Sequence, residues 1–141
     1  MLYEAIHKLV KNKQPRTENG NEPIVYAVKN GHVKMAEFII QRSADKNPES
    51  KNSLTVLHKA AKYGHVEICE SILKHLKDKN PKCKYSGTTP LHMAANYGHT
   101  DICKLIIENG EETNPKDFHG RTPMDLAAQN GYKSVCQLFQ E

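Results

Sequence analysis

The chain has 141 residues, of which 38% are hydrophobic and 26% are charged, and its formal net charge is +4. This composition is typical of a folded chain and argues against a disordered one. Its longest apolar runs, such as residues 38–40, are far shorter than the roughly 20 residues that span a membrane, and its N-terminus lacks a signal-peptide core. We therefore expect neither a membrane partner nor secretion.

The cysteines also argue against secretion. Four cysteines are too few for a disulfide scaffold in a chain of this length, and none are paired in the C-x-x-C spacing of zinc sites. We expect a reducing compartment, the cytoplasm or the nucleus.

The first predicted element is a helix over residues 1–16. Its apolar residues fall on one helical face, and charged residues such as Glu4 and Lys8 fall on the other. The apolar face consists of Leu2, Ala5, Ile6, Leu9 and Val10.

Beyond this helix, one pattern recurs four times. It reads YAVKNGH at 26–32, KAAKYGH at 59–65, MAANYGH at 93–99 and LAAQNGY at 126–132, and the glycines are 33, 34 and 33 residues apart. A fixed period of this length indicates a stack of small helical repeats.

Each unit is predicted to form two helices. The first opens at Thr-Pro, where Thr89 or Thr122 caps the helix and proline occupies its first position, and it closes at the glycine. The second helix carries apolar residues at helical spacing, as at Val66, Cys69, Ile72, Leu73 and Leu76. We expect it to continue to the Asn-Pro pair, because proline disfavours helix at the preceding residue.

The units cover about 17–49, 50–83, 84–116 and 117–141. Residues 1–16 fall in a second-helix slot, and we expect them to form a half-repeat that caps the stack. The first unit departs most from the pattern, the second has Ser53 in place of the turn glycine, and an extra residue after Asn80 is expected to lengthen one loop.

The segments GTTPLHMAANYGH at 87–99 and GRTPMDLAAQNGY at 120–132 resemble the ankyrin repeat, and the period agrees over nearly the whole chain. The resemblance implies an all-α solenoid of helix–turn–helix repeats with short β-hairpin-like loops, forming a single domain over residues 1–141. It also implies that His58 and His92 form hydrogen bonds between adjacent repeats.

The same resemblance implies a noncatalytic module, an adaptor or inhibitor, that binds another protein through the concave face. We found no phosphate loop, zinc helix, nucleophile elbow or calcium loop. We expect no enzymatic activity, no catalytic residues, no cofactor and no metal. We also expect the chain to be monomeric.

The hairpin tips and short helices form the expected binding face, which gathers four of the six tyrosines. Tyrosine and arginine are enriched where interfaces carry their binding energy. Alternatively, some rings cover the alanine-rich helices and stack on the next repeat. The predicted partner-binding residues are Tyr26, Lys59, Lys62, Tyr63, Tyr85, Met93, Asn96, Tyr97, Phe118, His119 and Arg121.

Lysines 29, 51, 59 and 62 gather toward the first two full repeats. They favour an acidic partner segment, although a solvated face explains them equally well. Nucleic-acid binding is the alternative function, and we rank it low because the chain has only Arg16, Arg42 and Arg121, and arginine dominates base and phosphate recognition.

Asn47, Asn80 and Asn114 stand sixteen residues after the first three repeat glycines. They match the hairpin asparagine that asparaginyl hydroxylases modify in many ankyrin repeats, so hydroxylation is a predicted side-role. A structural interpretation, in which the side chain caps the hairpin backbone, is favoured over it.

The cysteines fall into two groups. Cys69, Cys103 and Cys136 occupy one slot in successive repeats and are predicted to be core residues, because helices packed about 8–10 Å apart are too distant for disulfides between them. Cys83 lies in the lengthened loop, where we expect an exposed and oxidisable thiol.

Overall fold

The computed structural model describes residues 23–49, 52–110 and 112–140, which contain eight α-helices. The helices are α2 (Pro23–Asn30), α3 (Val33–Arg42), α4 (Val56–Tyr63), α5 (Val66–Leu73), α6 (Pro90–Asn96), α7 (Thr100–Asn109), α8 (Pro123–Gln129) and α9 (Lys133–Leu138). An isolated antiparallel bridge joins Glu49 to Thr55 in the first loop. The predicted half-repeat helix over 1–16 lies outside the described residues.

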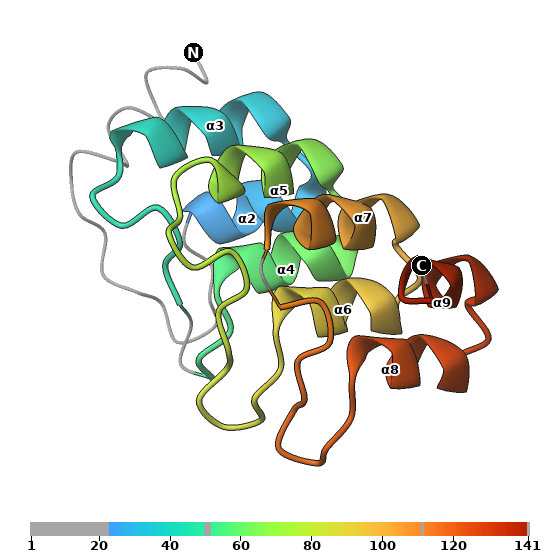
Figure 1. Cartoon of the computed structure of the whole chain (residues 1–141). Coiled ribbons are helices and arrows are strands. Elements are labelled where there is room, and N and C mark those ends of the chain that lie inside the picture. Colours follow the sequence, from blue (N-terminus) through green and yellow to red (C-terminus); the bar gives the residue numbers. More distant parts are fainter. Residues whose placement is uncertain (1–22, 50–51, 111, 141) are drawn as a thin grey trace.

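The helices form two layers. The first helices of the repeats, α2, α4, α6 and α8, pack side by side in one layer, and the second helices, α3, α5, α7 and α9, pack side by side in the other (Figure 1). The loops between repeats extend beyond the layer of first helices. The all-α repeat solenoid predicted from the period is therefore confirmed.

Capping boxes start three of the first helices. The hydroxyls of Thr55, Thr89 and Thr122 each accept a hydrogen bond from the backbone N–H three residues later, and the side chain at that later position accepts from the threonine N–H. The caps expected at Thr89 and Thr122 are confirmed. Val56 replaces proline after Thr55 without losing the cap, because that N–H has no partner within the helix anyway.

The repeat glycines end the first helices in the left-handed conformation, as Gly98 does with a φ of 75°. A β-carbon at Gly98 would lie 2.7 Å from Cδ1 of Tyr132 in the next repeat. Glycine is thus required both by the backbone turn and by the close approach of the following repeat.

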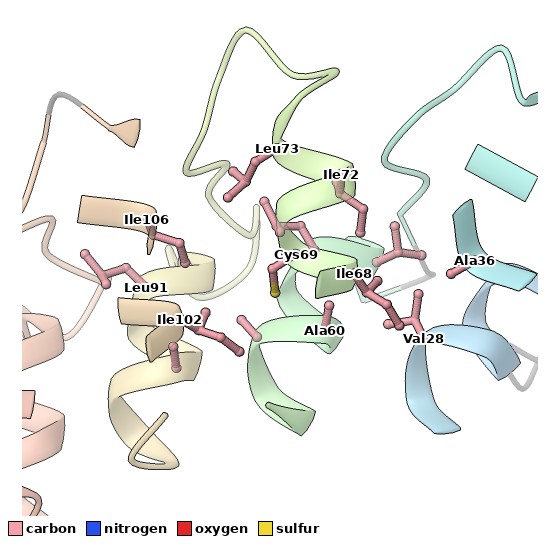
Figure 2. Close-up of a cluster of buried hydrophobic side chains, with 14 of the residues drawn as sticks. Val28, Ala36, Ala60, Ile68, Cys69, Ile72, Leu73, Leu91, Ile102 and Ile106 are labelled. Carbon is pink, nitrogen blue, oxygen red and sulfur yellow. The ribbon is translucent and has the colours of Figure 1, made fainter. Parts of the chain in front are cut away.

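The core lies between the two layers. Figure 2 shows Ile68, Cys69 and Ile72 of α5 packed between Val28 on one side and Ile102 on the other. The alanine pairs of α4 and α6 have no exposed surface, which lets neighbouring first helices approach closely.

The predicted cysteine ladder is confirmed for Cys69 and Cys103, which are fully buried, and burial raises the pKa of both thiols to about 12. Cys136 is half-buried. Its sulfur lies 4.0 Å from the Met124 carbonyl of α8, and within the described residues α9 packs against one neighbouring second helix, α7.

The second helices end earlier than the sequence predicted, since α5 stops at Leu73 and leaves Leu76 beyond it. The Lys79 ammonium donates to the Leu73 carbonyl, and in the preceding repeat Lys46 donates to the Ile40 carbonyl at 2.7 Å. These lysines satisfy terminal carbonyls that another helical turn would otherwise satisfy. The Asp78 carboxylate then accepts from the Asn80 N–H at 3.0 Å and turns the chain.

Candidate interaction surface

The loop tips are residues 52–54, 84–88 and 117–121. In the third tip, Gly120 N–H donates to the Asp117 carbonyl at 3.0 Å, which closes a four-residue turn. In the second tip, Gly87 N–H donates to the Cys83 carbonyl at 2.8 Å, which closes a turn one residue longer. The predicted extra residue after Asn80 is absorbed by this wider turn.

Hydrogen bonds join neighbouring tips. Phe118 N–H donates to the Ser86 carbonyl at 2.9 Å, and Lys84 N–H donates to Oγ of Ser53 at 3.1 Å. Ser53 takes the turn-glycine position with a φ of 63°, and its hydroxyl forms this link to the next tip. The tips therefore form one continuous edge beside the first helices.

Cys83 is buried, with 3% of its surface exposed, so the expectation of an exposed thiol was wrong. Its Sγ donates to the Asn52 carbonyl of the preceding tip at 3.2 Å. Burial opposes ionisation of this thiol, but hydrogen bonds from Ser86, Tyr85 and Ser53 outweigh it and lower the pKa of Cys83. The lengthened loop folds over the thiol instead of presenting it.

Asp117 organises the third tip. Its carboxylate accepts from the N–H groups of His119 and Arg121 and from Nε of Arg121, all at 2.9 Å. Burial of the carboxyl would raise its pKa, but these hydrogen bonds outweigh burial and hold the pKa of Asp117 below its usual range. The Arg121 guanidinium, predicted to contact a partner, is already paired within its own tip, while the His119 side chain is exposed.

Two predicted histidine links between repeats are confirmed. Nε2 of His58 donates to the Thr88 carbonyl, and Nε2 of His92 donates to the Arg121 carbonyl, each at 2.8 Å. Burial lowers the pKa of His58 to about 4 and also lowers that of His92, so both rings are neutral at pH 7. A neutral ring has one N–H, which these links place on Nε2.

A second set of histidine links, which was not predicted from the sequence, runs in the opposite direction. Nε2 of His65 donates to the Lys29 carbonyl at 3.3 Å, and Nε2 of His99 donates to the Lys62 carbonyl at 2.8 Å. The recurring Gly-His pair was the available signal, because His65 and His99 stand at the N-cap positions of second helices and their rings reach the preceding repeat.

The aromatic residues predicted to bind a partner are all exposed. The exposed fractions are 55% for Tyr26, 39% for Tyr63, 73% for Tyr85, 42% for Tyr97 and 65% for Phe118. Two of them also pack within the stack: Tyr26 lies beside His32, with ring centroids 5.6 Å apart, and the Phe118 ring lies over Gly87. The rings thus retain exposed surface while being partly held in place.

Lys62 brings two of these rings together. Its ammonium nitrogen lies 5.5 Å from the Tyr63 ring centroid and 5.6 Å from that of Tyr97, within the range of cation–π attraction. Tyr63 ends α4, and Tyr97 follows α6 directly. The three residues therefore form one cluster across neighbouring first helices.

The other predicted contact residues on the first helices are half-buried: Lys59, Met93 and Asn96. Oδ1 of Asn96 accepts from Nδ2 of Asn130 in the next repeat at 2.9 Å. Asn96 therefore takes part in packing between repeats as well as facing outward.

The loop asparagines divide into two classes. Oδ1 of Asn47 accepts from Leu57 N–H at 2.9 Å, and Oδ1 of Asn80 accepts from Leu91 N–H at 3.2 Å, so each amide ties a loop to the following first helix. Asn114 is exposed and makes no such bond to the described residues. The hairpin-capping role is present at two positions, while hydroxylation of all three stays a prediction.

Within the described ranges, no group of three or more His, Cys, Asp or Glu side chains is placed to hold a metal ion. None of the described helices is long and apolar enough to cross a membrane.

Two layers of stacked helix pairs, tied by histidines and edged by linked loop tips, define a helical repeat protein. A family model described as ankyrin repeats (3 copies) matches residues 2–83 and 71–141, and the chain belongs to the ankyrin-repeat family. Ankyrin repeats generally mediate contacts between proteins and are typically noncatalytic. No curated protein matches the chain.

Proposed function

We propose that the chain is a noncatalytic adaptor or inhibitor that holds a partner protein against its first helices and loop tips. The observation that carries this proposal is the cluster of Lys62, Tyr63 and Tyr97, whose two rings are each about 40% exposed on neighbouring first helices. We expect one monomer of the chain to bind one partner.

The physical argument concerns the rings. Tyrosine buries a large area on binding and loses little rotamer entropy, since it has two side-chain torsions, and it still offers a hydroxyl for hydrogen bonding. Rings already packed against Lys62 lose less freedom still when a partner covers them. Phe118 and Tyr85 supply further exposed aromatic surface along the edge of tips.

The test is affinity capture with the chain as bait, followed by identification of the bound protein by mass spectrometry and measurement of its affinity. Tyr97→Ala and Phe118→Ala should each weaken that complex by about 1–2 kcal/mol, as expected for aromatic contact residues. Glu70→Ala on the exposed surface of α5 is the control and should leave the affinity unchanged.

Urea denaturation of the same variants separates binding from folding. A Tyr97→Ala chain that loses stability yet binds its partner as tightly as before would show that the ring serves the stack. A partner whose affinity responds to neither aromatic substitution would show that it binds elsewhere.

A further inference from the structure

The Lys62 side chain is held in place before any partner arrives. Its ammonium nitrogen lies 5.5 Å from the Tyr63 ring centroid and 5.6 Å from the Tyr97 ring centroid, and the side chain is half-buried. Its backbone carbonyl accepts from Nε2 of His99 at 2.8 Å, so the last turn of α4 is tied to the following repeat. A lysine on a free surface loses much rotamer entropy when it binds, and Lys62 has already lost part of it.

The rings hold this cation without neutralising it. Cation–π attraction leaves the full positive charge, whereas a carboxylate would cancel it. Within the described residues, the ion pairs are Lys84 with Glu49 and Arg121 with Asp117, all in the loops, and no described carboxylate pairs with Lys62.

The charge of the surrounding face has one sign. Helices α2, α4 and α6 contain three lysines, Lys29, Lys59 and Lys62, and no Asp or Glu. Asp125, on α8, is exposed, and its carboxylate caps its own helix by accepting from Thr122 N–H at 2.9 Å. The second helices differ, since α5 and α7 both carry acidic residues.

We propose that the partner is an acidic protein segment that places a carboxylate on Lys62 and an apolar side chain beside it on the Tyr63 and Tyr97 rings. This inference rests on the proposed function, since it requires the first helices to bind a protein. Because the Lys62 side chain is half-buried, less water screens its charge. Lys62 therefore attracts a carboxylate more strongly than a fully solvated lysine does. The rings around it bury the neighbouring apolar side chain.

Nucleic acid fits the same face poorly. A strand needs several cations to match its closely spaced phosphates. Yet the Arg121 guanidinium is paired with Asp117, and Lys46 and Lys79 cap helix ends. The first helices therefore offer too few lysines for a run of phosphates, whereas a single carboxylate needs only Lys62.

The probe is a labelled peptide of about ten residues. An extended peptide of this length is long enough to cross three first helices that lie about 9 Å apart. It alternates Glu with Ser around one central Phe, and its control has Gln at every Glu. A single-stranded oligothymidine of similar length tests the nucleic-acid alternative. Binding is followed by NMR titration of the isotope-labelled chain.

We expect the acidic peptide to shift the amide signals of Lys62, Tyr63 and Tyr97. At about 50 mM NaCl it should bind at least about fivefold more tightly than the Gln peptide, and the difference should shrink at about 300 mM as salt screens the charges. Lys62→Met should weaken the acidic peptide about fivefold. Lys104→Met, on the exposed surface of α7, should leave its affinity unchanged.

Several results would overturn the inference: no shifts with the acidic peptide, equal affinity for the Gln peptide, equal effects of the two lysine substitutions, or tighter binding of oligothymidine. The captured partner then separates the two proposals. If Tyr97→Ala weakens that partner and Lys62→Met does not, the acidic-segment inference fails while the proposed function stands. If Lys62→Met, Tyr97→Ala and Phe118→Ala all leave the partner's affinity unchanged, both fail.

Discussion

His58 shows how one residue links local and long-range structure. Its Nδ1 accepts from the Thr55 N–H at 3.2 Å and closes a capping box, while its Nε2 donates to the Thr88 carbonyl thirty residues away. In α8 the equivalent residue is Asp125, which keeps the capping box and has no N–H to donate onward. The cap at Nδ1 therefore depends on the imidazole staying neutral, because a protonated ring carries an N–H on Nδ1 and can no longer accept there.

The pH dependence of stability follows from this burial. The pKa of His58 is about 4 in the folded chain against 6.5 for an unperturbed histidine, so the unfolded chain takes up the proton first as pH falls. The contribution of His58 to stability is fully present above about pH 6.5. It is lost progressively as the pH falls to about 4. His58 alone should lower the free energy of unfolding by about 2 kcal/mol between pH 7.5 and pH 5.

Urea denaturation at the two pH values measures this loss. His58→Gln keeps a capping side chain at the third helical position and should show a smaller drop between pH 7.5 and pH 5 than the unsubstituted chain. His119→Gln, at an exposed tip histidine, should show the full drop. An unchanged drop in His58→Gln would mean that other groups control the acid sensitivity.

At the scale of the helices and turns, the repeat glycines share a backbone conformation but differ in surroundings. Gly98 and Gly131 have φ values of 75° and 78°. A β-carbon on Gly98 would lie 2.7 Å from the Tyr132 ring, whereas one on Gly131 would meet nothing within 4 Å. The turn and the packing between repeats can therefore be measured separately.

Gly131→Ala should reduce the free energy of unfolding by about 1–2 kcal/mol, the penalty for an L-residue in the left-handed region. Gly98→Ala should lose about 1–3 kcal/mol more, because the Tyr132 ring must move aside. Chemical denaturation of the two variants gives both values. Equal losses would show that Tyr132 shifts freely and that the close approach adds nothing to stability.

Across the whole molecule, each repeat is stabilised by its neighbours. The second alanine of the pair has no exposed surface at Ala61 and Ala95, which lie between first helices, but Ala128 of α8 is exposed. In a linear stack, stability is the sum of terms within repeats and terms between neighbours. Within the described residues, the repeat of α8 and α9 has a neighbouring repeat on one side only.

Hydrogen exchange should reflect this difference between the inner repeats and the last described repeat. We expect backbone amides of α4 to α7 to exchange at least about tenfold more slowly than those of α8 and α9, because the last repeat opens without disturbing the others. Mass spectrometry of peptic fragments resolves these segments. Uniform protection across the stack would indicate that all repeats unfold together.

The resemblance to the ankyrin repeat implied the histidine links from His58 and His92. The sequence by itself determined the repeat, the helix pairs, the threonine caps, and the buried cysteine ladder of Cys69 and Cys103. These depend on local geometry and on contacts that recur in the same register, so one period predicts them all. The candidate aromatic residues could be named from their slots for the same reason.

Only the tertiary structure decided which side chains meet. It placed Lys62 between Tyr63 and Tyr97, buried Cys83 against Asn52, and paired Arg121 with Asp117. Each outcome depends on a loop conformation or side-chain direction particular to one position, and the repeat period contains no information about these. Stacking brings residues some 29 to 37 positions apart into contact, and the chemistry of the binding face arises from these contacts between repeats.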